Sequence, residues 1–269
     1  MKYKLLALDM DGTVLNGKKE ISEKTLQAIR QAMELGVIVT IATGRSWQAL
    51  EQYPELLELI EPPIIVYNGG MVISTDGKDI LFRQNLSEKA ALEVIGHGRA
   101  NGVIQYVWSD ETLYVDGSLA QIERYISEVG TKYTILEDPE PLAKQGITKV
   151  LWSGEPDEIA KYQEMLPGVI EAKDMHYFTS SPWYLEFMDH RISKGATLAR
   201  FAEHFEIKPE EVIAVGDGMN DVTMLQYAGL GVAMANGAEE LKQIADFITG
   251  TNEEDGVAQV IEQFIVSAS

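Results

Sequence analysis

Short apolar segments alternate with amphipathic segments in the first part of the chain. Lys4–Leu8, Val37–Ala42 and Ile64–Tyr67 are apolar runs, and Ser22–Leu35 repeats apolar residues at helical spacing between a capping Ser and a terminating Gly. We expect a second helix from about Ser46, between the second and third runs. Continuous apolar strands that alternate with amphipathic helices are typical of a parallel sheet covered on both faces. The pattern therefore predicts an α/β fold of three layers.

The pattern changes between about Phe82 and Asp189. The candidate strands there look half-buried, and several come in neighbouring pairs. They are Val103–Trp108, Thr112–Val115, Thr148–Trp152 and Tyr184–Met188. This middle segment is therefore predicted to be an α+β insert.

The alternation of strands and helices returns from Lys194 onward. Val212–Val215 and Gly231–Ala233 are further apolar runs, and a last helix is expected near Gly256–Ser267. We therefore predict that residues 1–81 and 190–269 form one α/β core, interrupted by an α+β domain at residues 82–189.

Composition narrows the classes of chemistry that remain. The 269 residues include no cysteine, which excludes disulfides, thiolate nucleophiles and cysteine-rich zinc sites, so any metal should prefer oxygen ligands. The formal net charge of −20 disfavours binding to nucleic acid or an anionic membrane, because both need a basic patch. No apolar run approaches the ~20 residues of a membrane span, and the apolar start is cut short by Asp9, so we expect a cytoplasmic protein without a signal peptide.

Two acidic residues follow the first predicted strand. The segment Asp9-Met10-Asp11-Gly12-Thr13 lies at the carboxyl end of that strand, the edge of an open parallel sheet at which ligands bind. Asp and Gly also form ordinary turns. A turn needs only one Asp, however, and two at this spacing repel each other unless a cation joins them. The pair therefore indicates a cation site.

A second acidic loop, Gly216–Asp221 (GDGMND), directly follows the predicted strand Val212–Val215. Taken alone, it is equally well explained as a strand-to-helix turn with Asn220 or Asp221 as the helix cap. Two acidic loops at the ends of two parallel strands can, however, meet over one edge of a sheet. Carboxylate oxygens with several retained waters are the ligands that suit Mg²⁺.

Two further segments offer groups for an anion. Thr43-Gly44-Arg45 supplies a hydroxyl, backbone N–H groups and a helix N-terminus, although a Thr that merely caps a helix is the commoner explanation. Lys194 lies in the first turn of a predicted helix, where the helix dipole disfavours a cation by ~0.3–1 kcal/mol. Gly195 beside it weakens the helix further. A solvated Lys is one explanation, and a Lys that points at a phosphate is the other.

These four segments, in this order, resemble the four motifs of the haloacid dehalogenase superfamily, and within it the Cof-type hydrolases. Asp9–Thr13 fits motif I, Thr43–Arg45 motif II, Lys194 motif III and Gly216–Asp221 motif IV. Tyr67–Gly70 resembles the Asn-Gly turn that follows the third core strand in such proteins. The resemblance covers nearly the whole chain. It implies a Rossmann-like core with an inserted type IIB cap, the α+β domain that sets substrate specificity.

The resemblance also implies an activity and a set of residue roles. The protein is expected to be an Mg²⁺-dependent phosphatase that hydrolyses small phosphate monoesters, such as sugar phosphates or phosphorylated cofactors, through an aspartyl-phosphate. Asp9 is the implied nucleophile and Asp11 the implied general acid/base. The implied metal ligands are Asp9, the Asp11 backbone carbonyl and Asp217. The groups implied to hold phosphoryl oxygens are the Met10 N–H, Thr43, Gly44, Lys194 and Asn220. The implied supporting residues are Asp221, Arg45 and Asn68.

Two other activities remain open from the sequence. A phosphomutase with the same cap would return the phosphoryl group to a sugar instead of to water. A ligand-sensing or regulatory protein would keep the site and use the cap to bind a ligand or partner. The complete set of catalytic residue types favours the phosphatase, while the natural substrate and the oligomeric state cannot be read from the sequence.

Overall fold

The computed structural model describes residues 2–117, 122, 126 and 132–267, and these form two compact units. The core unit comprises the chain up to Gly44, Tyr53–Leu81 and the chain from Ser193 onward. The insert unit comprises Arg45–Gln52 and Phe82–Ile192. Residue 1, most of residues 118–131 and residues 268–269 of the predicted domains lie outside the described residues.

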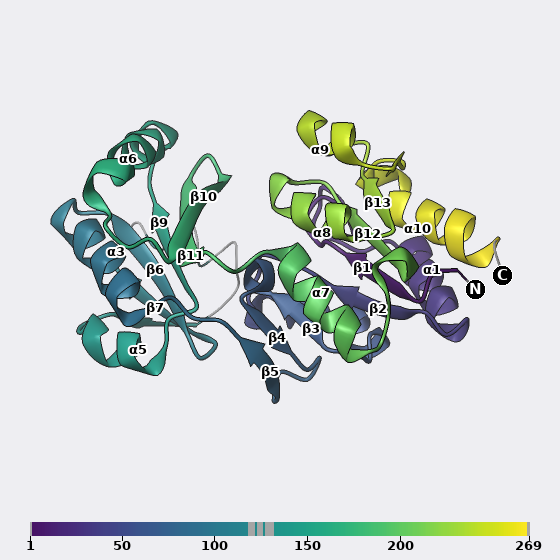
Figure 1. Ribbon diagram of the computed structural model, residues 1–269, viewed down its shortest axis with the longest axis horizontal. Coiled ribbons are helices and arrows are strands. Elements are labelled where there is room, and N and C mark those ends of the chain that lie inside the picture. Colours follow the sequence, from purple (N-terminus) through teal and green to yellow (C-terminus); the bar gives the residue numbers. More distant parts are fainter. Residues whose placement is uncertain (1, 118–121, 123–125, 127–131, 268–269) are drawn as a thin grey trace. The chain divides into compact units, whose positions relative to one another are not determined.

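The described part of the core unit is built on a parallel sheet ordered β14-β13-β12-β1-β2 (Figure 1). Its strands are β1 (Leu5–Leu8), β2 (Ile38–Ile41), β12 (Val212–Gly216), β13 (Leu230–Ala233) and β14 (Phe247–Ile248). β1 pairs with both β12 and β2, so that Leu8 lies opposite Val215 on one side and Ile41 on the other. Strands β1 and β12 are buried along their whole length. The predicted parallel sheet is confirmed.

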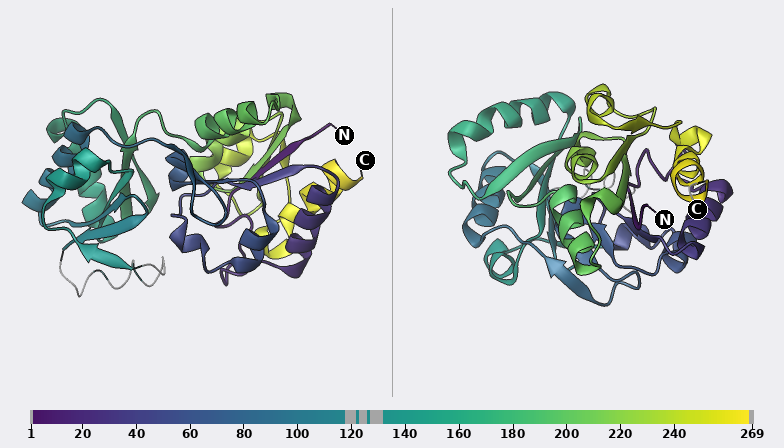
Figure 2. Two further views of the ribbon diagram at one scale, coloured as in Figure 1. Left: turned by 90° about the horizontal axis from the view of Figure 1, so that it is seen from below. Right: turned by 45° about the vertical axis from the view of Figure 1, so that its right-hand side comes forward.

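Helices cover both faces of this sheet. The helices α1 (Glu23–Glu34) and α10 (Gly256–Ile261) pack together on one face, and α7 (Lys194–His204) and α8 (Val222–Tyr227) pack together on the other (Figure 2). The helix α10 continues into a π-helical turn at Glu262–Val266, close to the predicted last helix. The remaining elements of this part of the chain are α2 (Pro54–Leu59), α9 (Glu239–Ile244) and a small sheet ordered β3 (Ile64–Val66), β4 (Met71–Ile73) and β5 (Ile80–Arg83).

The continuous helix predicted from about Ser46 is wrong. That segment contains only a 3₁₀ turn at Gln48–Leu50 and the six-residue α2, which begins at Pro54. A proline has no backbone N–H and fixes its own φ, so it is tolerated in the first turn of a helix but interrupts a longer one. Pro54 therefore divides the predicted helix into two short elements.

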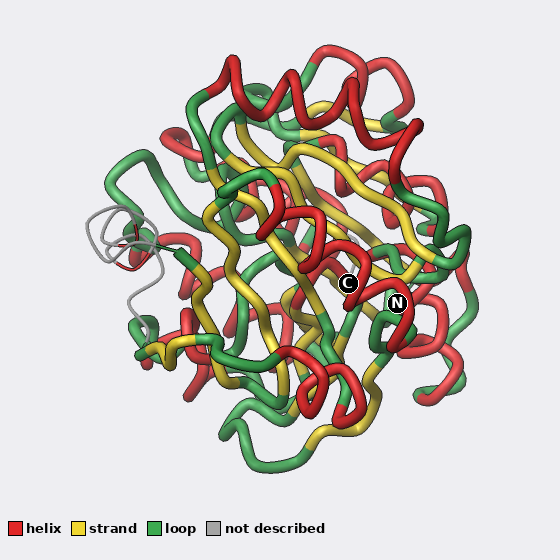
Figure 3. The backbone as a smooth tube through the Cα atoms, turned by 90° about the vertical axis from the view of Figure 1, so that its left-hand side faces the viewer, coloured by secondary structure: helices red, strands yellow, loops and turns green. Residues whose placement is uncertain are grey.

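The insert unit contains a mostly antiparallel sheet ordered β10-β11-β9-β6-β7-β8 within its described residues. These strands are β6 (Ile104–Ser109), β7 (Thr112–Asp116), β8 (Tyr133–Ile135), β9 (Lys149–Ser153), β10 (Met175–Ser181) and β11 (Tyr184–Asp189). Its helices are α3 (Glu88–Ala100), α5 (Pro139–Gln145) and α6 (Pro156–Val169). In Figure 3 these helices lie in front of the strands, and one apolar cluster joins the helices to the sheet. The role of the insert unit in substrate selection stays a prediction.

No helix among the described residues is both long enough and apolar enough to cross a lipid bilayer.

Gly195 occupies a place where two helices approach closely. A Cβ atom at this position of α7 would lie 2.2 Å from the backbone oxygen of Thr223 and 2.9 Å from the backbone nitrogen of Met224, both in α8. The Gly195 N–H also donates to the Thr223 hydroxyl at 3.0 Å. The glycine therefore weakens the helix in isolation, as the sequence indicated, but allows α7 to pack directly against the backbone of α8.

We predict that Gly195→Ala destabilises the fold by about 1–3 kcal/mol, because α7 must move away from backbone atoms that cannot rotate aside. The matched control is Gly96→Ala in α3, where no atom lies within 4 Å of the added Cβ. That change should be neutral or stabilise by about 0.5–1 kcal/mol through helix propensity. Urea unfolding of both variants measures the difference, and equal effects would contradict the close-packing argument.

Candidate active site

Three carboxylates converge at the carboxyl end of the core sheet. Asp9 directly follows β1, and its backbone N–H donates to the Val215 oxygen of the neighbouring strand at 2.9 Å. Asp217 and Asp221 lie in the loop and 3₁₀ turn that follow β12. One oxygen from each of Asp9, Asp217 and Asp221 lies within 4.8 Å of the others. The register between two adjacent parallel strands thus brings together residues more than 200 positions apart.

Lys194 lies between two of these carboxylates. It is the first residue of α7 and is completely buried, and its Nζ atom is 2.5 Å from Asp9 Oδ1 and 2.6 Å from Asp221 Oδ1. Ser193 caps the helix by accepting the Ala196 N–H at 3.1 Å. A cation is tolerated at this unfavourable end of a helix because two buried anions compensate it. Lys194 is therefore not a solvated surface lysine.

Asp221 has a different environment from the other two carboxylates. Its Oδ1 atom accepts from Lys194, and its Oδ2 atom accepts the backbone N–H groups of Asp217 and Gly218, each at 2.9 Å. The residue is also completely inaccessible to solvent. Both oxygens are thus engaged within the protein, which leaves Asp9 and Asp217 as the carboxylates of this group with the more available oxygens.

The close packing of carboxylates changes how tightly they hold protons. Burial and the negative charge of Asp221 raise the pKa of Asp9 well above its usual value, although Lys194 opposes the change. Burial and Asp221 likewise raise the pKa of Asp217 to about 6. Burial alone would lower the pKa of Lys194, but the charges of Asp221 and Asp9 raise it above its ordinary value. Three carboxylates and one ammonium ion leave two excess negative charges, which a divalent cation would neutralise.

Gly12 allows motif I and motif IV to approach each other. Its φ of +76° lies in the left-handed region, and a Cβ there would lie 2.2 Å from Asp217 Oδ2. Any other residue would therefore be strained and would also displace the Asp217 carboxylate. Gly12 does form a turn, which was one explanation of the segment from the sequence. The same turn also makes room for the Asp217 carboxylate.

A second group of polar residues joins motif II to motif IV. The Thr43 oxygen accepts the Asn68 N–H at 2.8 Å, and the buried Asn68 side chain accepts from Asn220 Nδ2 at 3.0 Å. The Thr43 N–H donates to Ile65 of β3 at 2.9 Å. Thr43, Asn68 and Asn220 therefore lie together, and Gly44 packs against the Asn68 side chain. Asn68 links two segments that were predicted to bind the same phosphoryl group.

Asp11 does not belong to the cluster of three carboxylates, although its charge adds to the raised pKa of Asp217. Its side chain is 46% exposed, and its Oδ1 atom is 3.3 Å from Lys19 Nζ. Met10, between the two acidic residues, is completely buried, and its backbone oxygen accepts the Leu15 N–H at 2.9 Å. Asp9 and Asp11 thus lie in different environments, one buried and one partly open to solvent.

Three residues that the sequence did not indicate hold the motif I loop in place. Asn236 Nδ2 donates to the Gly12 oxygen at 2.8 Å, and Asn252 Nδ2 donates to the Leu15 oxygen at 2.8 Å. Glu253 Oε1 accepts the Gly17 N–H at 2.6 Å. Asn236 lies in the loop between β13 and α9, and Asn252 and Glu253 lie in the 3₁₀ turn after β14. They have no local motif, so only the tertiary structure identifies them.

Arg45 belongs to the insert unit, so its supporting role stays a prediction. The roles of the remaining predicted residues also stay predictions, although Asp9, Asp217, Asp221 and Lys194 lie in direct contact or close proximity.

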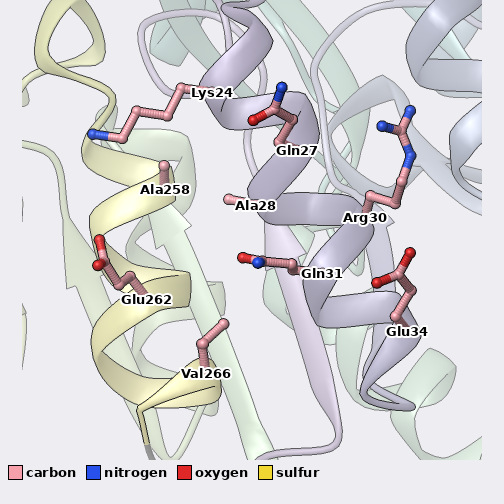
Figure 4. A pocket seen from close by; sticks show the side chains of 9 residues that line it. All are labelled: Lys24, Gln27, Ala28, Arg30, Gln31, Glu34, Ala258, Glu262 and Val266. Atoms are coloured by element: carbon pink, nitrogen blue, oxygen red, sulfur yellow. The ribbon is translucent and has the colours of Figure 1, made fainter.

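A groove of about 480 Å³ lies between α1 and the C-terminal helical segment (Figure 4). It is lined by Lys24, Gln27, Ala28, Arg30, Gln31, Glu34, Ala258, Glu262 and Val266. Two basic side chains, Lys24 and Arg30, and two acidic ones, Glu34 and Glu262, are among them, and none of the predicted site residues lines it. The groove is therefore separate from the candidate active site.

Comparison with known proteins agrees with this geometry. The model of the haloacid dehalogenase-like hydrolase family matches residues 6–261. The 5-amino-6-(5-phospho-D-ribitylamino)uracil phosphatase YcsE of Bacillus subtilis (strain 168) is 33% identical, over 98% of this chain and 96% of that protein.

Solved structures give the same result. A haloacid dehalogenase-like hydrolase from Bacteroides thetaiotaomicron shares 31% sequence identity, with a TM-score of 0.87 over 98% of this chain and 100% of that chain. A subclass IIB sugar phosphatase shares the fold at 23% identity, with a TM-score of 0.83 over 97% of this chain and 98% of that chain. The predicted family and fold class are therefore confirmed, and the chain belongs to the haloacid dehalogenase-like hydrolases, as a phosphatase with the subclass IIB fold.

Proposed function

We propose that this phosphatase hydrolyses small phosphate monoesters with the help of Mg²⁺, and that Asp9 is transiently phosphorylated. The observation that carries the proposal is the buried contact of Lys194 with Asp9 and Asp221, beside Asp217. A nucleophilic carboxylate must lie next to positive charge to accept a phosphate dianion. Asp9 has this environment, because the completely buried ammonium group of Lys194 lies 2.5 Å from its oxygen.

The donor set fits a magnesium ion. Asp9, Asp217 and the Asp11 backbone carbonyl would hold it, and these are oxygen ligands that leave positions for water. When bound, Mg²⁺ supplies positive charge that stabilises the phosphoryl oxygens during transfer. The raised pKa values of Asp9 and Asp217 support this assignment, because the site holds excess negative charge without a cation.

In the proposed first step, an oxygen of Asp9 forms a bond to phosphorus as the bond from phosphorus to the ester oxygen breaks. Lys194 stabilises the negative charge on the transferring group, and Thr43, Gly44 and Asn220 hold its oxygens. Asp11 donates its proton to the departing ester oxygen, so that the alcohol leaves neutral.

In the proposed second step, water attacks the phosphorus of the aspartyl-phosphate. Asp11, now ionised, accepts a proton from this water, and the bond between phosphorus and the Asp9 oxygen breaks to release inorganic phosphate. The partly exposed position of Asp11 supports the role, because its carboxyl group is accessible to solvent water. Asp221 contributes by holding Lys194 and the backbone of the Asp217 loop.

The natural substrate is proposed to be a sugar phosphate or a phosphorylated cofactor or cofactor precursor. The likeness to YcsE supports including 5-amino-6-(5-phospho-D-ribitylamino)uracil among the candidates. Steady-state profiling of a panel that contains this compound, hexose phosphates and pyridoxal phosphate tests the proposal. A release of phosphate only from diesters or from protein would contradict it.

We predict that Mg²⁺ stabilises the protein more at pH 7.5 than at pH 5. The pKa of Asp217 is about 6 in the fold, against an ordinary value of 3.8. The metal-free fold therefore binds the proton more tightly than the unfolded chain and loses stability as pH rises from about 4 to about 6. Mg²⁺ replaces that proton, so its effect should grow over the same range and level off above about pH 7.

Thermal unfolding in EDTA and in excess Mg²⁺ at several pH values measures this effect. Asp217→Asn removes one proposed Mg²⁺ ligand and should therefore reduce the difference in melting temperature between EDTA and Mg²⁺ at every pH. EDTA should also abolish hydrolysis of 4-nitrophenyl phosphate, and Mg²⁺ should restore it better than Ca²⁺, which takes more ligands at longer distances. If the difference in melting temperature between EDTA and Mg²⁺ stays constant or narrows as pH rises, the proposed Mg²⁺ site is contradicted.

We predict opposite behaviour for the two aspartates of motif I. Asp9→Asn removes the attacking oxygen, so neither turnover above background nor a phosphoenzyme is expected. Asp11→Asn keeps the nucleophile and removes only proton transfer, so kcat should fall by about 10²–10⁴-fold. With an activated leaving group such as 4-nitrophenol, the first step needs little protonation. The Asp11 variant should then accumulate phosphoenzyme and show a burst of 4-nitrophenol.

Rapid-quench labelling with an activated, ³²P-labelled phosphate ester distinguishes these outcomes. A labelled phosphoenzyme in Asp9→Asn would show that another residue is the nucleophile. Absence of label at all times from both the wild type and Asp11→Asn would show that water attacks phosphorus directly.

A further inference from the structure

The turn that follows motif I presents a lysine at the acid/base residue. Residues 16–20 form a tight turn around the Asn16 side chain, which accepts the backbone N–H groups of Lys18 and Glu20, each at 2.9 Å. The Asn16 N–H donates to the Glu20 oxygen, and the Lys19 N–H donates to the Asn16 oxygen, again at 2.9 Å. This turn directs Lys19 back toward Asp11, and the two charged atoms are 3.3 Å apart.

The backbone at Lys19 is unfavourable for a lysine. Its φ of +64° lies in the left-handed region, where a Cβ atom is crowded and where Gly or Asn would be favoured. Strained residues of this kind are concentrated at functional sites. The ion pair does not explain the strain, because 65% of the Lys19 side chain and 46% of the Asp11 side chain are exposed, and pairs this exposed contribute little to folding.

The position of the turn is defined by contacts with the rest of the core unit. Gly17 donates its N–H to Glu253 at 2.6 Å, and the Leu15 oxygen accepts from Asn252 at 2.8 Å. Asn252 in turn donates its backbone N–H to Asn236 Oδ1 at 2.9 Å, and Asn236 holds the Gly12 oxygen. Motif I and the Lys19 turn are therefore held by one network, which fixes the start of the Lys19 side chain relative to Asp11.

We propose that Lys19 is a specificity-determining residue that binds an anionic group of the leaving alcohol. The inference rests on the proposed role of Asp11 as general acid. A general acid lies about 2.6–3.2 Å from the oxygen that it protonates. Because Lys19 Nζ is 3.3 Å from the Asp11 carboxylate, the ammonium group lies within about 6 Å of the ester oxygen.

This geometry identifies a class of substrate. A carboxylate or second phosphate on the carbon next to the esterified carbon would lie within hydrogen-bond distance of Lys19. A substrate with only hydroxyl groups there would gain less, because a hydrogen bond to a charged partner is the stronger kind. Lys19 also offsets the repulsion that the many acidic residues of this chain, with a net charge of −20, would exert on such an anion.

A matched pair of esters tests the proposal. 2-Phosphoglycerate and glycerol 2-phosphate are both secondary esters, and they differ in a carboxylate that replaces a hydroxymethyl group. Their inhibition constants are measured against 4-nitrophenyl phosphate hydrolysis by the full-length protein with Mg²⁺, so the result holds whether or not either ester is itself turned over. Lys19→Met should raise the inhibition constant of 2-phosphoglycerate about tenfold more than that of glycerol 2-phosphate. Lys19→Arg should keep most of the discrimination.

The control is Lys18→Met, which removes the same charge from a neighbouring residue that joins the turn through its backbone N–H. The ratio of the two inhibition constants should not change in this variant. Equal changes for both esters in Lys19→Met would overturn the proposal, because Lys19 would then act only through Asp11. The same change of ratio in Lys18→Met would also overturn it, because the effect would come from net charge. Failure of the proposed role of Asp11 would appear separately, as a kcat of Asp11→Asn that equals that of the wild type.

Discussion

The site depends on the placement of one buried ammonium group between two buried carboxylates. Lys194 is completely inaccessible and lies 2.5 Å from Asp9 and 2.6 Å from Asp221. Removing either kind of charge from such a group leaves the other without compensation, which costs far more than an exposed ion pair contributes. The contact therefore determines both where α7 must begin and how much negative charge the neighbouring loops can carry.

The sheet and two glycines make this arrangement possible. Parallel pairing of β1 with β12 brings the loops after both strands to one edge, and Gly12 leaves room there for the Asp217 carboxylate. Gly195 allows α7 to pack against the backbone of α8, which carries the chain onward from the Asp217–Asp221 loop. The chemistry thus follows from packing, because charges at this density need fixed partners before a substrate arrives.

Local patterns predicted the parts of the site that lie at the ends of strands. The apolar runs before Asp9 and Asp217 predicted that these two carboxylates lie at one sheet edge. The helix position of Lys194 left a solvated side chain and a phosphate-binding one both open, and its burial excludes the first. The prediction of one helix from about Ser46 was wrong because Pro54 divides the segment into a 3₁₀ turn and the short helix α2. Asn236, Asn252 and Glu253 could not be predicted, because their hydrogen bonds join residues more than 200 positions apart and any loop can contain an Asn or Glu.

The most direct measurement of the central interaction is a double-mutant cycle on Lys194 and Asp221, with the free energy of unfolding measured in EDTA. Lys194→Met alone should cost about 3–5 kcal/mol, because Asp9 and Asp221 then lack their cation. Adding Asp221→Asn removes one of those uncompensated charges, so the double variant should be more stable than the sum of the single effects by about 2 kcal/mol or more. Effects that add to within about 0.5 kcal/mol would show that the two residues do not depend on each other, and would contradict the account.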